Sequence, residues 1–156
     1  LQAIAEGRAT LDRAKVDAER KVTQRWLREM GLGSGMQRGI TERVEAALDG
    51  IRGDQRGRWI LEGEGHAELA LTGQIDGNIE SVVLDRVRID ENGDHWIIDY
   101  KTSTHEGGNL KGFLQAEVDR YTPQIQKYAE IYEAFAGTQP RCALYFPLLR
   151  EFVEVQ

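Results

Sequence analysis

The stretch IESVVLDRVRIDENGDHWIIDYKTS, residues 79–103, decides the fold of this chain. Two runs rich in Val, Ile, Leu, Trp and Tyr flank the turn-forming segment ENGD (91–94), a pattern typical of a β-hairpin. The dipeptide Asn92-Gly93 suits a two-residue turn in which both residues have positive φ. We therefore expect 79–90 and 95–103 to pair as antiparallel neighbours.

Side chains two residues apart share one face of a strand, and this rule predicts the faces on which three charged residues of the hairpin lie. In the second strand, Asp99 and Lys101 must lie on the same face. In the first strand, Asp85 should share its face with Ile79, Ser81, Val83, Val87 and Ile89. If the two faces coincide, two carboxylates and an ammonium meet in a small volume.

Such a group has a clear chemical use. Two carboxylates suit Mg²⁺ or Mn²⁺, which binds a few acidic side chains together with water and substrate phosphate. Lys101 could orient or deprotonate a water, or offset charge on a reacting phosphoryl group, while the metal lowers the pKa of its bound water. The spacing alone equally allows a structural ion pair of Lys101 with Asp99 or Asp85, since Asp-x-Lys is a common pattern.

Elements of both kinds surround the hairpin. Apolar residues at helical spacing predict helices over 10–30, 41–50 and 122–136, and the glycines of 31–39 predict a flexible turn rather than a phosphate-binding loop. Further strands are expected at 58–61, 66–73, 142–147 and 151–155. This order indicates an α/β or α+β sheet flanked by helices, with a helical part (1–57) and a sheet core (58–156) in one domain.

Composition limits the class of protein. The 156 residues include 29% charged and 40% hydrophobic side chains, which suits one folded domain and not a disordered chain. No apolar run reaches the roughly 18–20 residues of a membrane-spanning helix, and we expect no signal peptide, because the first residues lack a basic start followed by an apolar core. A single cysteine, Cys142, excludes a disulfide framework and a cysteine-ligated cluster within these residues, so we expect a cytoplasmic protein.

The net charge of −6 does not favour binding of nucleic acid by bulk electrostatics. The charge is uneven, because 1–58 holds 12 Lys/Arg against 9 Asp/Glu, and 59–156 holds 8 against 17. Carboxylates gathered for a metal and solvated faces that happen to differ are equally good explanations.

Three motifs in order resemble those of a known family: LDRV with Asp85, IIDYKTS with Asp99 and Lys101, and Gln124 with Tyr128 in a Q-x-x-x-Y helix. Over roughly 66–155 the chain resembles the RecB-type nuclease domain of the PD-(D/E)XK superfamily. That domain lies at the C-terminus of bacterial ATP-dependent helicase–nucleases of the UvrD/Rep class. The resemblance implies a restriction-endonuclease-like mixed central sheet flanked by helices.

The resemblance also implies roles for single residues. Asp85, Asp99 and the backbone carbonyl of Tyr100 would bind catalytic Mg²⁺ or Mn²⁺, and Lys101 would act on the attacking water. Gln124 and Tyr128, one helical turn apart, would line the site and position the DNA backbone or the lysine, although Tyr128 also fits an apolar stripe. Glu68 matches an acidic position near the start of the family's sheet, where an exposed strand acid is an equal alternative.

We therefore expect a metal-dependent deoxyribonuclease of exonuclease type, part of an ATP-binding helicase–nuclease of DNA repair and recombination. Its partners would be DNA, the motor domains of the same polypeptide and a second helicase–nuclease subunit, with no membrane. The alternative is a catalytically silent, nuclease-like scaffold or DNA-guiding domain. The family's early metal-binding histidine is not found before the hairpin, and the chain starts at Leu1. We expect that histidine upstream of a fragment that can be inactive in isolation.

Overall fold

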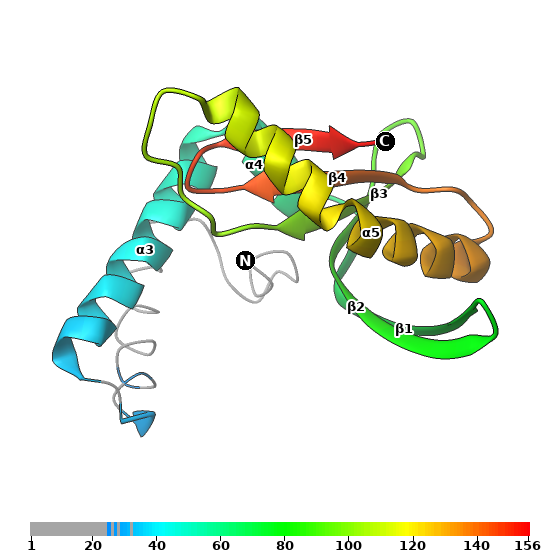
Figure 1. Cartoon of the computed structure of the whole chain (residues 1–156), viewed down its shortest axis with the longest axis horizontal. Helices are drawn as coiled ribbons and strands as arrows, with labels where there is room; N and C mark the ends of the chain where they lie inside the picture. Colours follow the sequence, from blue (N-terminus) through cyan, green and yellow to red (C-terminus); the bar gives the residue numbers. More distant parts are fainter. Residues whose placement is uncertain (1–24, 26, 28, 32) are drawn as a thin grey trace.

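A central sheet of five strands, in the order β1-β2-β3-β4-β5, organises the molecule (Figure 1). The computed structural model describes residues 25, 27, 29–31 and 33–156. The strands are β1 (Gly65–Ile75), β2 (Asn78–Ile89), β3 (His95–Tyr100), β4 (Arg141–Phe146) and β5 (Glu151–Val155). Only β3 and β4 are parallel, so the sheet is mixed, as expected.

Helices cover both faces of this sheet. They are α3 (Ser34–Gly53), α4 (Gln55–Leu61) and α5 (Leu110–Ala136). Helix α5 supplies the crossover that two parallel strands need, and it runs across one face of the sheet (Figure 1). None of the helices in the described part of the chain is long and apolar enough to cross a membrane.

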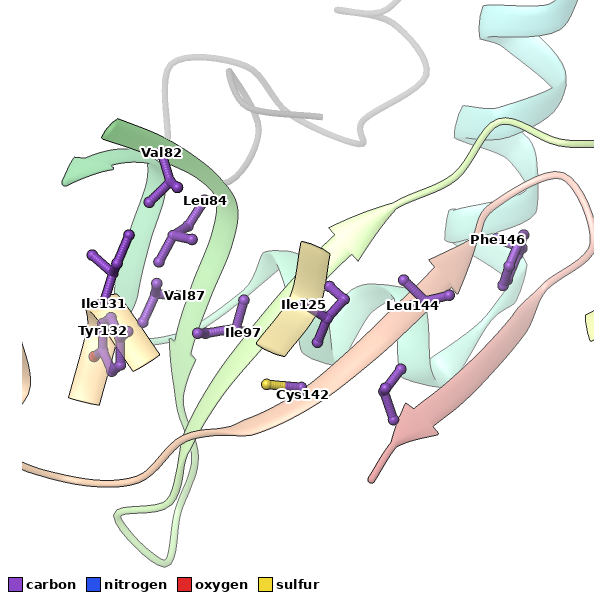
Figure 2. Packing of buried hydrophobic residues seen from close by; sticks show 11 residues of the cluster. Val82, Leu84, Val87, Ile97, Ile125, Ile131, Tyr132, Cys142, Leu144 and Phe146 are labelled. Atoms are coloured by element: carbon purple, nitrogen blue, oxygen red, sulfur yellow. The ribbon is translucent and has the colours of Figure 1, made fainter. Parts of the chain in front are cut away.

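The sheet has a separate apolar core on each face. On the α5 face, Ile125, Ile131 and Tyr132 pack with side chains of four strands, which include Leu84, Val87, Ile97, Cys142 and Leu144 (Figure 2). On the other face, Ile51 of α3 and Ile60 and Leu61 of α4 pack with Trp96, Ile98, Ala143 and Tyr145. Strand β3 thus contributes alternate residues to the two cores.

The predicted hairpin is confirmed, but its turn differs. Strands β2 and β3 are antiparallel, with Arg86 opposite Ile98 and Ile89 opposite His95. In the connecting loop only Gly93 has a positive φ, at 83°, and its N–H bonds to the Asp90 carbonyl. The turn is therefore not the two-residue type with both φ values positive, and the Asp90 carboxylate accepts from the N–H groups of Asn92 and Asp94 instead.

Three predicted elements are wrong in extent or type. The segment expected as a strand at 58–61 belongs to helix α4, because Asp54 caps that helix by accepting from the N–H groups of Arg56 and Gly57. Helix α3 begins at Ser34, so much of the glycine-rich segment expected as a turn is helical. Helix α5 begins at Leu110 rather than at residue 122, because Asn109 caps it.

Two further expectations concern the N-terminal half and the face of β2. The helix expected over 10–30 lies outside the described residues except at Arg25, Leu27 and Glu29, which are helical. The apolar face expected for β2 is wrong in its first half, where Ile79 and Val83 are exposed and the even-numbered Val82 and Leu84 are buried. The pleat changes face before Val87, which is buried on the α5 side.

Candidate active site

The site lies where β2 separates from β3. Their backbone pairing begins at Arg86 opposite Ile98, so by register Asp85 and Asp99 would form the next pair. Asp85 does not continue the ladder with its backbone. Its carboxylate Oδ2 instead accepts a hydrogen bond of 2.9 Å from the backbone N–H of Tyr100. The Asp85 side chain is thereby fixed beside the end of β3, while the β1–β2 ribbon curves away (Figure 1).

A local distortion of β1 faces Asp85. The β1–β2 register is regular on both sides, but no pair joins Glu68 to Asp85, and Glu68 has a φ of +48°. A non-glycine residue with a positive φ costs about 1–3 kcal/mol of backbone strain, and such residues cluster at active sites and ligand-binding sites. The distortion coincides with the change of pleat in β2, and the Glu68 side chain itself is exposed.

Strand β3 ends at Tyr100, so the strand expected over 95–103 is too long, but Asp99 and Lys101 still lie on one side of the chain. The Lys101 Nζ lies 2.6 Å from the Asp99 Oδ2, and both side chains are largely buried. Burial raises the pKa of Asp99 above its ordinary value, the Lys101 ammonium opposes that rise, and the negative charge of Asp85 adds to it. The structure therefore brings Asp85, Asp99 and Lys101 to one end of β3, where the two carboxylates influence each other.

The segment that follows β3 is anchored on three sides. The Lys101 N–H donates to the Tyr145 carbonyl of β4, and the Arg43 guanidinium of α3 donates to the Thr102 carbonyl. The Ser103 hydroxyl donates to the Glu117 carboxylate of α5 at 2.9 Å. These contacts fix the backbone that carries Lys101 without using its side chain.

Gln124 and Tyr128 lie on α5 and hydrogen-bond to each other, with the Gln124 amide as donor. Together with Pro123 and Lys127 they line a groove of about 500 Å³ whose other wall is residues 80–83 of β2. This wall ends two residues before Asp85, and neither the two carboxylates nor Lys101 line the groove. The aromatic contact to Lys101 comes from another residue of α5, Tyr121, whose ring centroid lies 3.5 Å from the ammonium.

Two residues near the site were not identified from the sequence. Glu117 is buried and holds Ser103, and Tyr121 holds Lys101. With Gln124 and Tyr128 they form a stripe on α5 at spacings of four, three and four residues, which is one face of a helix. Glu117 was missed because the helix was expected to begin after it, and Tyr121 because it fits the apolar stripe.

The acidic pair is compatible with one hydrated cation but does not enclose it. The described residues contain no group of three or more His, Cys, Asp or Glu side chains that could hold a metal. Mg²⁺ usually keeps several waters and takes only one or two carboxylates from the protein. Two interacting acids, one of them buried, match that donor set. Tyr100 directs its side chain to the other face of the sheet, against Tyr145, and its backbone belongs to the site.

Comparison with known proteins identifies the family. A search of curated proteins found no match. The sequence model of the PD-(D/E)XK nuclease superfamily matches residues 1–154, a range that extends well before the 66–155 expected from the motifs. The mixed five-stranded sheet with flanking helices is consistent with the restriction-endonuclease-like fold of that superfamily. The chain belongs to the PD-(D/E)XK nuclease superfamily.

Proposed function

We propose that this chain is a metal-dependent deoxyribonuclease domain that hydrolyses DNA phosphodiester bonds with Mg²⁺ or Mn²⁺. Membership of the superfamily implies nuclease-type activity, and its members generally use divalent metals. The observation that carries the proposal is the meeting of Asp85, Asp99 and Lys101 at the end of β3.

Each of the three residues has a distinct task in this proposal. Asp85 and Asp99, with the backbone carbonyl of Tyr100, would hold the cation, which supplies Lewis acidity and lowers the pKa of its bound water. The Tyr100 N–H holds the Asp85 carboxylate in place. The Lys101 ammonium lies beside the Asp99 carboxylate, where it can orient a water or offset negative charge on the phosphate.

The groove beside Gln124 and Tyr128 supports a role in holding the DNA backbone next to the carboxylates. An amide and a hydroxyl are both suitable donors to phosphate oxygens. Their mutual hydrogen bond fixes both groups on α5 before substrate arrives. Both residues would contact the DNA backbone as neutral hydrogen-bond donors. Such contacts do not depend on the base sequence.

We further propose that the domain is RecB-type and acts as an exonuclease at the C-terminus of an ATP-dependent helicase–nuclease of the UvrD/Rep class. The three motifs in order support this assignment. Motor domains of the same polypeptide would supply most of the affinity for DNA, so a net charge of −6 is compatible with the proposal. A second helicase–nuclease subunit and a role in DNA repair and recombination belong to the same proposal.

The test is cleavage of linear DNA by the full-length protein with Mg²⁺ or Mn²⁺, with chelator and a matched RNA as comparisons. Asp85→Ala, Asp99→Ala and Lys101→Ala should each lower the rate by about 100-fold or more, as expected for loss of a catalytic group. Lys111→Ala, which removes an exposed lysine in the first turn of α5, is the matched control and should leave the rate unchanged. Unchanged cleavage by Asp99→Ala and Lys101→Ala would refute the proposal.

One observation favours a second candidate, a catalytically silent scaffold or DNA-guiding domain. The Lys101 ammonium lies 2.6 Å from the Asp99 carboxylate, so the two charges can serve as a buried structural ion pair without a metal. Calorimetric titration with Mn²⁺ separates the two candidates. Binding that is lost in Asp85→Ala and Asp99→Ala supports the nuclease, and the absence of such binding in the full-length protein supports the scaffold.

A further inference from the structure

We infer that Tyr121 is a positioning residue, whose ring holds the Lys101 ammonium beside Asp99 and leaves the ammonium's hydrogen-bond donors free for water and phosphate. The inference rests on the proposed nuclease function and assigns a new residue to the same site.

The contacts of the Lys101 ammonium are few and specific. Its Nζ lies 2.6 Å from the Asp99 carboxylate and 3.5 Å from the centroid of the Tyr121 ring, and its side chain is 13% exposed. A lysine side chain has many rotamers, so a partly buried ammonium needs contacts to hold one position. The carboxylate supplies one contact and the face of the ring supplies the other.

The ring itself is held in place by α5. Tyr121 is half-buried and packs against the core on the α5 face of the sheet. One helical turn earlier, Glu117 accepts from Ser103, two residues after Lys101. The segment 101–103 and the helix segment 117–121 are thus joined at both ends, which fixes the distance between the ring and the ammonium.

The chemistry of a ring differs from that of a second carboxylate. A desolvated cation over an aromatic ring is attracted to the ring's electron density without taking up a directed hydrogen bond. An ammonium has three N–H donors. With one contact to Asp99, the remaining donors can reach a water or a phosphate oxygen.

The contact between the Tyr121 ring and the Lys101 ammonium should persist when a metal cation is bound. A cation held by Asp99 shares the carboxylate oxygens on which Lys101 otherwise depends. Tyr121 carries no negative charge, so it does not compete for that cation. It remains as the contact that keeps the ammonium near the carboxylates.

The first readout is independent of activity. In the full-length protein with lysines ¹³C-labelled at Cε, the Lys101 methylene signal, assigned by its loss in Lys101→Arg, should be shifted upfield by the ring of Tyr121. Tyr121→Phe should keep this shift, and Tyr121→Leu should abolish it. A Lys101 signal at the position of exposed lysines in the wild-type protein would overturn the inference, whether or not the protein cleaves DNA.

The second readout is the kinetics of DNA cleavage. Tyr121→Phe should stay within about threefold of the wild-type kcat, and Tyr121→Leu should lose about 30-fold, which corresponds to 2 kcal/mol. KM for DNA and the affinity for Mn²⁺ measured by calorimetry should each change less than threefold. Fluorinated phenylalanines at this position weaken the ring's electron density at nearly constant shape, so they should lower kcat progressively. This series keeps the test valid if the leucine variant does not fold.

Phe135→Leu removes an exposed aromatic ring from the same helix and is the matched control. Equal losses of kcat in Tyr121→Phe and Tyr121→Leu, or a kcat that is flat across the fluorinated series, would show a merely structural role and overturn the inference. These outcomes differ from failure of the proposed function, which would appear as cleavage that survives Lys101→Ala.

Discussion

The carboxylate of Asp85 accepts a hydrogen bond from the backbone N–H of Tyr100, the residue between Asp99 and Lys101. A side chain thus replaces the backbone contact that a continuing ladder between β2 and β3 would make. The sheet can open at this point without leaving a buried N–H unpaired, and the same bond sets the position of one acid relative to the other. Structure and proposed chemistry therefore depend on the same atom.

Because Asp85 has both a structural and a proposed catalytic role, two variants of this residue should differ in stability but not in their loss of activity. Asp85→Ala removes the acceptor and should lower the free energy of unfolding by about 1–3 kcal/mol, since the Tyr100 N–H is left without a partner. Asp85→Asn retains an acceptor oxygen and should cost less, while both variants lose DNA cleavage because the negative charge is gone. Urea unfolding of the 156-residue chain in chelator checks the difference, and equal stability of the two variants would contradict it.

The raised pKa of Asp99 predicts that this residue weakens the fold at neutral pH. Burial favours the neutral carboxyl in the folded state. At a pH below the ordinary Asp pKa of 3.8, Asp99 is neutral in both states and this stabilisation of the neutral form is fully present. As the pH rises, the unfolded chain ionises first, so the wild-type chain loses stability up to and through the raised pKa of the folded state.

Asp99→Asn mimics the neutral form, so its free energy of unfolding should exceed that of the wild type by a margin that grows as the pH rises from 3.8 through the raised pKa of the folded state. Urea unfolding across this range in chelator measures the margin. Asp76→Asn, at an exposed turn residue with a φ of 49° that asparagine tolerates, is the matched control and should show a constant difference. A margin for Asp99→Asn that is constant or shrinks with pH would refute the prediction.

Short-range patterns were sufficient to predict the hairpin and the shared face of Asp99 and Lys101. Turn-forming residues and a period of two act within a few residues, and both follow from the sequence alone. The change of pleat near Asp85 could not be predicted, because it accompanies a positive φ at Glu68 on the neighbouring strand. The contact of Tyr121 with Lys101 depends on how α5 crosses the sheet, which no local pattern specifies.

Helix boundaries failed for a related reason. The segment RWIL has the composition of a strand, but the Asp54 cap and the packing of Ile60 and Leu61 under the sheet make it helical. In α5 the cap at Asn109 follows two glycines that suggest a loop. A cap is one side chain, and tertiary packing decides whether it is used.

Arg86, next to Asp85, should be a structural arginine whose loss unfolds the chain more readily. It is fully buried, and its guanidinium donates to the carbonyls of Ile60 and Gly63 at 2.9 and 3.1 Å, at the end of α4. Arg86→Leu leaves both carbonyls unpaired and should lower the free energy of unfolding by about 3 kcal/mol or more. Arg58→Ala, which removes an exposed arginine of α4, should change it by less than about 0.5 kcal/mol. Urea unfolding of both variants measures these values, and similar stability of the two would refute this role.

Two glycines in neighbouring helices should respond oppositely to alanine. A Cβ at Gly57 would lie 2.3 Å from the Tyr145 hydroxyl oxygen, which is buried and donates to Asp54, the cap of α4. Gly57→Ala must displace this hydroxyl and should lower the free energy of unfolding by about 1–3 kcal/mol, as overpacking does. A Cβ at Gly39, inside α3, meets nothing within 4 Å, so Gly39→Ala should raise stability by about 0.5–1 kcal/mol through helix propensity. Thermal and urea unfolding of the two variants should move in opposite directions, and a stabilised Gly57→Ala would show that the hydroxyl and the cap of α4 are not coupled.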